Sequence, residues 1–219
     1  MEARPGARAT LIRVRVPPPF LGQWESRELI GAILREETRA ADDPLWARSG
    51  ARHAAEYERW SWHLCGTACL RMALAGLGIA PPPLLELARA LVRHGGYVEE
   101  ENGWIRGLIY AGAVALLEER YGIGAEIVLD SPTEAIPALL ARGAAYIASV
   151  HPAIRSPAAE PPSRGGHLVL VFAAEDGAVR FHNPSGDTRA TQEDVRMALP
   201  DFARFHAERG ILVLGRGER

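Results

Sequence analysis

Three residues whose side chains can together perform nucleophilic catalysis stand far apart in the chain, in the order Cys65, His167 and Asn183. The thiolate of a cysteine is a strong nucleophile, and a neighbouring imidazole can take the proton of the thiol. A side-chain amide can hold that imidazole in one orientation. The three residues are therefore predicted to form a catalytic triad, provided that the fold brings them together.

Cys65 is predicted to lie in the first turn of a helix over residues 65–76, which is apolar on almost every side and is therefore expected inside the protein. The helix dipole favours a thiolate at this end, and free N–H groups there can bind an oxyanion. On the helix alone, an inert core thiol is the favoured interpretation of Cys65, and it is also the interpretation of Cys69. The spacing of His63, Cys65 and Cys69 does not match that of a structural zinc site, so no metal is expected.

His167 and Asn183 are predicted to lie on neighbouring strands over residues 167–174 and 178–183. If the three residues between the strands form a loop that ends with Gly177 in the left-handed region, His167 and Asn183 share a face of the sheet, with Cβ atoms roughly 7 Å apart. A two-residue turn would instead separate the two side chains, and a bulge would also alter the pairing. Taken jointly with this geometry, the catalytic interpretation of Cys65 is favoured.

The composition is that of an ordinary globular protein. The chain has 219 residues, with 47% hydrophobic residues, 24% charged residues and a net charge of -2. This balance predicts no general attraction to nucleic acid or to an anionic membrane. The N-terminus lacks the apolar core of a signal peptide, and no apolar run approaches the roughly 20 residues of a membrane span. A cytoplasmic protein without a cofactor is expected.

The pattern of the chain predicts helices first and a mostly antiparallel sheet second, which is the α+β class. Residues 1–42 are predicted to be a strand and helix extension that packs on a domain formed by residues 43–219. The polar stretch 39–62 is expected to form loops and short helices. The expected helices span 26–38, 65–76, 81–93, 108–121, a short segment up to 141, and 201–208. The expected strands span 10–16, 125–129, 144–150, 167–174, 178–183 and 210–214.

The motifs resemble those of the papain-like cysteine peptidases that include the double-glycine leader peptidases of bacteriocin exporters and their stand-alone relatives. The similar region runs from about residue 43 to residue 214. Its motifs, in family order, are Cys-Gly-Thr-Ala-Cys-Leu, a helix and strand at 136–150, Gly-Gly-His-Leu-Val-Leu-Val and His-Asn-Pro. The resemblance implies a two-lobed fold in which a central helix carrying Cys65 packs on a sheet carrying His167 and Asn183. It also implies that Cys65 is the nucleophile, His167 the general base and Asn183 the residue that orients the base.

The sequence departs from the family pattern at the oxyanion hole. The family places a Gln a few residues before the Cys, and residues 59–64 contain none. The remaining oxyanion candidates are Ser61, His63 and the backbone of Cys65. Small or aromatic residues near the motifs are candidates for the substrate groove, namely Trp62, Gly66, His151, Gly165 and Gly166.

The leading functional hypothesis is a hydrolase that acts on a peptide through a thioester on Cys65. A first alternative is acyl transfer, in which the same thioester passes to an amine and the Pro-rich loop over residues 151–164 excludes water. A second alternative is a papain-like module that binds a peptide without cleaving it. In each case the expected partner is a peptide or a peptide-like substrate.

Overall fold

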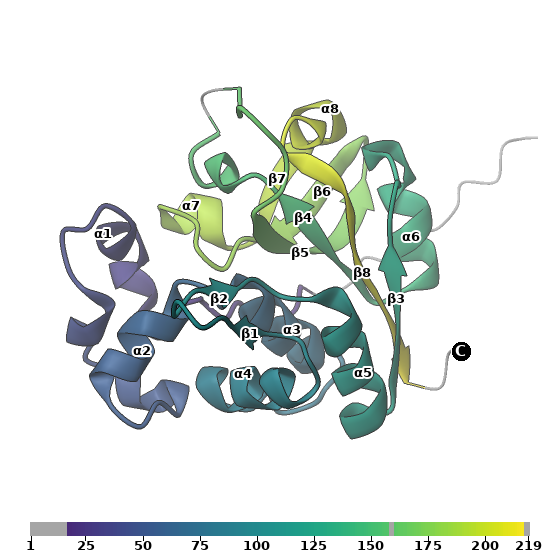
Figure 1. Ribbon diagram of the computed structural model, residues 1–219. Helices are drawn as coiled ribbons and strands as arrows, with labels where there is room; N and C mark the ends of the chain where they lie inside the picture. The colour runs from purple at the N-terminus through teal and green to yellow at the C-terminus, as the bar shows by residue number, and fades with distance from the viewer. Residues whose placement is uncertain (1–16, 158–159, 217–219) are drawn as a thin grey trace, which may run out of the picture.

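A computed structural model describes residues 17–157 and 160–216. The strand predicted over residues 10–16 lies outside these described residues. Within them the chain combines helices with an antiparallel sheet, which confirms the predicted α+β class (Figure 1). No described helix has both the length and the apolar character needed to cross a membrane.

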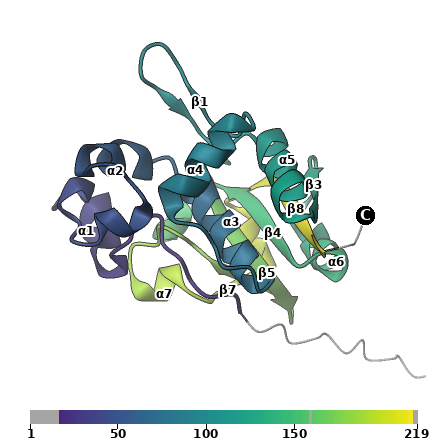
Figure 2. The ribbon, with the colours of Figure 1, turned by 90° about the horizontal axis from the view of Figure 1, so that it is seen from below.

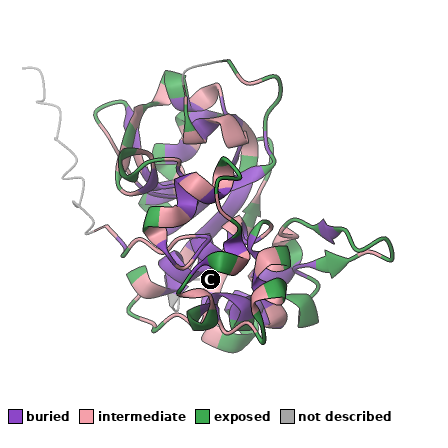
Figure 3. Ribbon diagram, turned by 90° about the vertical axis from the view of Figure 1, so that its left-hand side faces the viewer, coloured by how far each residue is buried: buried purple, intermediate pink, exposed green. Residues whose placement is uncertain are grey.

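The main sheet has six strands in the order β3-β8-β4-β5-β6-β7, and each neighbouring pair is antiparallel. Every residue of β4 and the first six residues of β5 are buried, because helices cover both faces of these central strands. Figure 3 shows these buried strands running through the middle of the molecule. The strand bounds are β3 Ile123–Val128, β4 Ala145–Val150, β5 His167–Glu175, β6 Ala178–His182, β7 Val195–Ala198 and β8 His206–Arg216.

One face of the sheet is covered by α3 Cys65–Gly76 and α5 Tyr110–Tyr121, and α4 Leu84–Arg93 packs against both of these helices (Figures 1 and 2). The helix α3 has the bounds predicted from its apolar pattern, and it packs directly on β5 and β4. Side chains such as Leu168 and Leu170 of β5 join this first core. A central helix that carries Cys65 is thus fixed against the strand that carries His167.

The opposite face of the sheet carries a second core beneath α6 Ile136–Arg142 and α8 Leu199–Ala203. Successive residues of a strand point to opposite faces, so Val169 and Val171 of β5 belong to this second core. The helix predicted over 201–208 is shorter than expected because the long strand β8 already begins at His206.

Short elements surround these layers. A two-stranded hairpin projects from the helical side of the molecule (Figure 2). The helix predicted over 26–38 was wrong in length: it ends at Leu34, and Glu36 takes a left-handed φ of 58° that a helix cannot accommodate. The remaining elements are η1 Arg27–Leu29, α1 Ile30–Leu34, η2 Ala40–Asp42, η3 Trp46–Ser49, α2 Ala54–Ser61, β1 Val98–Glu99, β2 Ile105–Arg106, η4 Thr133–Ala135, η5 Pro152–Arg155 and α7 Arg189–Gln192.

The described part of the N-terminal region is tied to the end of β6. The Gln23 N–H donates to the carbonyl of Pro184, and His182 Nε2 donates to the carbonyl of Pro18. Trp24 is buried in the first core. Residues 17–25 therefore lie beside the segment that carries Asn183, while the domain boundary at residue 42 stays a prediction.

Candidate active site

Cys65 is the first residue of α3 and is half-buried. The N–H groups of Cys65 and Gly66 have no backbone acceptor among the described residues, as expected for the first turn of a helix. Gly66 is needed for close packing: a Cβ there would lie 2.6 Å from Leu108 Cδ2 and 2.9 Å from Leu168 Cδ1. The sulfur is thus held at a helix N-terminus that is pressed against β5.

His167 is the first residue of β5, and its ring is fixed by Asn183 directly after β6. His167 Nε2 lies 2.8 Å from Asn183 Oδ1, and the backbone N–H of Ser185 donates to the same oxygen over 3.2 Å. An N–H that donates to Oδ1 fixes the orientation of the amide, since an NH₂ group could not accept it. The ring proton is therefore assigned to Nε2, which leaves the lone pair on Nδ1 as the basic position of His167.

The hairpin between β5 and β6 reaches this pairing by a different route from the one predicted. The turn is a two-residue turn, with Asp176 and Gly177 both at positive φ, and it pairs Glu175 with Ala178. That register alone would separate His167 from Asn183. A bulge between Val171 and Ala173 then shifts the pairing by one residue and restores the predicted parity. Two departures from the predicted hairpin therefore cancel at the site.

Cys65 and His167 line the same cavity, which has a volume of about 530 Å³. Asn183 is fully buried behind His167. Within the described residues no hydrogen bond joins the sulfur of Cys65 to the His167 ring. The cavity is also lined by residues 107–111, Ser149, Gly166, Leu168 and Arg209.

The environment keeps the Cys65 thiol and the His167 imidazole neutral. Burial raises the pKa of the Cys65 thiol, although backbone hydrogen bonding to Leu168 and the charge of Arg155 oppose the rise. Burial, and after it the charge of Arg155, lowers the pKa of His167 to about 3, although the hydrogen bond to Asn183 opposes the fall. A neutral thiol beside a neutral imidazole is therefore the resting state at neutral pH.

Arg155 is a component of the site that the sequence did not indicate. It ends η5, in the Pro-rich loop after β4, and its Nε donates to Ser185 Oγ over 3.0 Å. Ser185 Oγ in turn lies 3.3 Å from His167 Nε2. A chain of polar contacts thus runs from the guanidinium through Ser185 to the ring, and the positive charge acts on both reacting groups. An arginine in a Pro-rich loop belongs to no motif, so no pattern in the sequence singled out Arg155.

Cys69 lies one turn further along α3 and is fully buried, as predicted. Its Sγ donates to the carbonyl of Leu168 over 3.5 Å, and burial raises its pKa well above the usual range. Of the two thiols, only that of Cys65 borders the cavity.

The two side chains considered for the oxyanion hole do not line the cavity. The Ser61 hydroxyl donates to the carbonyl of Glu58 over 3.5 Å, and the carbonyl of Ser61 accepts from Gln23 Nε2. The His63 ring packs edge-on against Trp104, and burial lowers its pKa. The backbone N–H groups at the start of α3 are the donors that remain beside the thiol.

Of the five residues considered for the substrate groove, the structure places two at the cavity. Gly166 lines the cavity, and Gly165 adjoins Arg209 and Ser149 in its wall. The remaining three are not among its lining residues: Trp62 packs edge-on against Trp24, Gly66 packs under Leu108, and His151 Nδ1 accepts from the Ala153 N–H at the start of η5.

No family model and no curated protein matches the chain. Among solved structures, the chain is similar to the peptidase domain of Streptococcus ComA, a bi-functional ABC transporter involved in a quorum-sensing pathway. The TM-score is 0.49 and the sequence identity is 13%, over 71% of this chain and 93% of that domain. At this level of similarity, the function has to be inferred from the chain's own residues.

Proposed function

We propose that the protein is a cysteine peptidase-type hydrolase that cleaves a peptide bond, with Cys65 as nucleophile, His167 as general base and acid, and Asn183 as the residue that orients the base. The hydrogen bond between His167 Nε2 and Asn183 Oδ1 carries the proposal. It leaves Nδ1 as the base on a ring that lines the same cavity as the thiol.

The chemistry follows from these groups. His167 Nδ1 takes the proton of the Cys65 thiol, and the sulfur forms a bond to the substrate carbonyl carbon. The oxygen of the tetrahedral intermediate is stabilised by the N–H groups of Cys65 and Gly66, which have no backbone acceptor. The C–N bond then breaks as His167 returns its proton to the leaving amine. Water, deprotonated by His167, hydrolyses the resulting thioester and frees the thiol.

Arg155 contributes a permanent positive charge, which Cys65, His167 and Asn183 lack. Its charge favours the thiolate of Cys65 and disfavours the imidazolium of His167. The thiolate is therefore stabilised by a permanent cation as well as by the transient imidazolium.

A peptide-binding module without hydrolytic activity is the second candidate. It is supported by the neutral resting state of both groups and by the lack of a hydrogen bond between the described side chains of Cys65 and His167. Acyl transfer to an amine uses the same thioester and differs only in the final acceptor.

The test combines thiol labelling with product analysis. Iodoacetamide is applied to the native protein across pH, and mass spectrometry locates the adduct. We expect Cys65 to be modified well before Cys69, and a mixture of peptides to be cleaved by the native protein but not by Cys65→Ala. An amide product formed with an added amine would reassign the activity to acyl transfer. Equal labelling of both thiols, or labelling only after denaturation, would contradict the proposal.

A further inference from the structure

The catalytic cavity holds a positive charge that has no counter-charge. Arg209 lines it, and none of the described lining residues is an aspartate or a glutamate. Arg209 also forms no ion pair with any described residue, although many other arginines of the chain do. An unpaired guanidinium in a cavity shared with a nucleophile is a binding group for an anion.

An irregularity in β8 places Arg209 in the cavity. The paired positions His206 and Gly210 of β8 face Val150 and Ala148 of β4, so the residues between them form a bulge. Within it Glu208 takes a left-handed φ of 55°, a costly conformation for a residue other than glycine. Bulges of this kind aim a side chain away from the regular pleat and are frequent beside functional sites.

Two hydroxyl groups converge with Arg209. A Cβ added to Gly165 would lie 3.0 Å from an Nη atom of Arg209 and 3.4 Å from Ser149 Oγ, so both polar groups approach the same point. Hydrogen bonding to Ser149 and to Arg209 opposes the rise that burial causes in the pKa of Tyr110. Arg209, Ser149 and Tyr110 therefore form one polar cluster, here named the Arg209 subsite.

The start of α5 adds further donors to the Arg209 subsite. Tyr110 is the first residue of this twelve-residue helix, and both Tyr110 and Ala111 line the cavity. Their N–H groups have no backbone acceptor among the described residues. The dipole of the helix favours a negative charge at this end.

We infer that the Arg209 subsite binds a carboxylate of the substrate beside the carbonyl group that Cys65 attacks. The ligand is the carboxylate of an acidic side chain or that of the peptide's C-terminus, since both present the same chemistry to a guanidinium and two hydroxyls. The inference rests on the proposed function only in taking the substrate to be a peptide.

Two alkylating agents of nearly equal size test the charge preference. Iodoacetate and iodoacetamide both form a thioether with Cys65 and release iodide, and they differ in carrying a carboxylate or an amide. Each rate at Cys65 is divided by the rate of the same agent with glutathione, which removes intrinsic reactivity. We expect a normalised preference for iodoacetate of about threefold or more, the size of one partly exposed ion pair.

Variants of Arg209 test whether this residue causes the preference for iodoacetate. Arg209→Gln is expected to abolish the preference, whereas Arg209→Lys retains part of it because the charge is kept. Arg142→Gln, which removes an exposed arginine of α6 outside the cavity, is the matched control and keeps the full preference. Equal normalised rates in the native protein, or a preference that survives in Arg209→Gln, overturn the inference. Failure of both agents at Cys65 would instead overturn the proposed function.

Protection by peptides distinguishes the two sources of the carboxylate. Acetylated alanine pentapeptides compete with iodoacetamide for Cys65: one carries a central glutamate and a C-terminal amide, one has a free C-terminal carboxylate, and one carries a central glutamine and a C-terminal amide. Stronger protection by the first assigns an acidic side chain, and stronger protection by the second assigns the C-terminus. Protection by neither carboxylate peptide beyond that of the neutral one contradicts the inference.

Discussion

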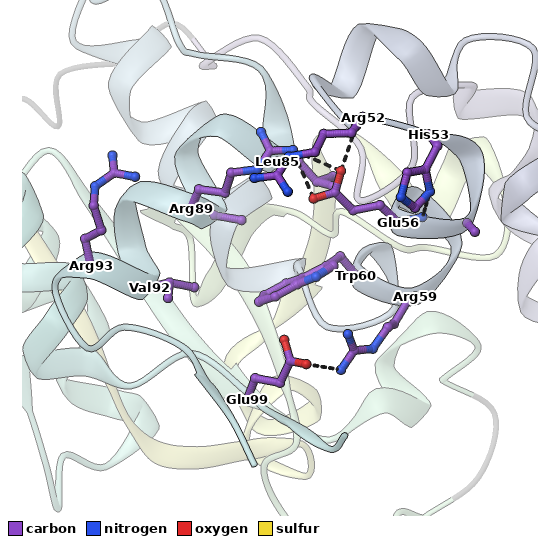
Figure 4. A pocket seen from close by; sticks show the side chains of 12 residues that line it. Arg52, His53, Glu56, Arg59, Trp60, Leu85, Arg89, Val92, Arg93 and Glu99 are labelled. Atoms are coloured by element: carbon purple, nitrogen blue, oxygen red, sulfur yellow. Dashed lines mark hydrogen bonds and ion pairs between the residues drawn. The ribbon is translucent and has the colours of Figure 1, made fainter. Parts of the chain in front are cut away.

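Two cavities in the described part of the chain differ in the groups that line them. The larger one, about 680 Å³, lies between α2 and α4, and the ring of Trp60 separates its two ion pairs (Figure 4). Arg89 pairs there with Glu56, and Arg59 pairs with Glu99. The two cavities have no lining residue in common.

The smaller cavity contains the groups of the proposed catalytic site. It holds a thiol, an imidazole with a free lone pair and an arginine without a carboxylate partner. In the larger cavity, Arg89 and Arg59 are paired with glutamates, while Arg52 and Arg93 form no ion pair with any described residue. The only imidazole among its described lining residues, that of His53, accepts from the Glu56 N–H to cap α2. The comparison teaches that a thiol and an imidazole with a free lone pair in one cavity, and not volume or an unpaired arginine alone, mark the candidate site.

The largest expected effect is a difference in peptide cleavage between variants of the two histidines that line these cavities. His167→Ala removes the base and should lower both peptide cleavage and alkylation of Cys65 at neutral pH, cleavage by about 10²- to 10⁴-fold. His53→Ala is the matched control: it removes a helix cap, costs about 1 kcal/mol of stability and leaves cleavage unchanged. Kinetics and thermal unfolding of both variants check the prediction. Equal losses of cleavage in the two variants would show that the two cavities do not differ in function.

A smaller effect is expected from the residue that orients the base. Asn183→Ala should reduce cleavage by about 10- to 100-fold, because the ring loses its fixed position relative to the thiol. Asn183→Asp keeps an acceptor for Nε2 and should recover part of the activity. The added carboxylate would also raise the pKa of His167, because it favours the imidazolium. A pH profile that does not move in Asn183→Asp would show that this amide does not act through the ring.

A third prediction concerns the charge beside the thiol. Arg155 lowers the pKa of both Cys65 and His167, so Arg155→Met should raise both values. Below the thiol pKa less thiolate is then present, and alkylation of Cys65 by iodoacetamide should slow by about fivefold or more, equivalent to about 1 kcal/mol. Ser185→Ala removes the hydrogen bond of Arg155 but not its charge, so its alkylation profile should shift less. Equal shifts in both variants would assign the effect to Ser185.

The smallest effect is expected in the larger cavity. Glu99→Gln breaks the exposed pair with Arg59 and should lower the free energy of unfolding by less than about 1 kcal/mol. Neither cleavage nor the reactivity of Cys65 should change. Chemical denaturation measures the first quantity and alkylation the second. A clear loss of cleavage would mean that the larger cavity belongs to the functional site after all.

The sequence predicted best those elements whose pattern is strong and local. The helix of Cys65 is apolar all round, and its bounds were correct to the residue. The strand that begins at His167 is an uninterrupted apolar run, and it too begins where expected. By contrast, the short strand β7 and the hairpin of β1 and β2 were missed, because segments of two to four residues carry little periodicity.

The polar surroundings of the site were invisible in the sequence for a physical reason. Arg155 is placed near the site by a short 3-10 turn and Arg209 by a bulge, and neither irregularity follows from alternation or helical spacing. The shared face of His167 and Asn183 was anticipated, but the turn that was expected to produce it was replaced by a tighter turn and a bulge. Side chains placed by irregular backbone can be found only once that backbone is known.

The bulge near Phe172 has a consequence for how this hairpin can change over evolutionary time. The tip of the hairpin, beyond this bulge, can gain or lose residues without moving the Asn183 amide and the His167 imidazole at the other end, provided that the bulge corrects the pairing of the strands. An insertion between His167 and the bulge has no such correction. It would place His167 and Asn183 on opposite faces of the sheet. The bulge therefore decides on which side of the sheet the amide and the imidazole meet.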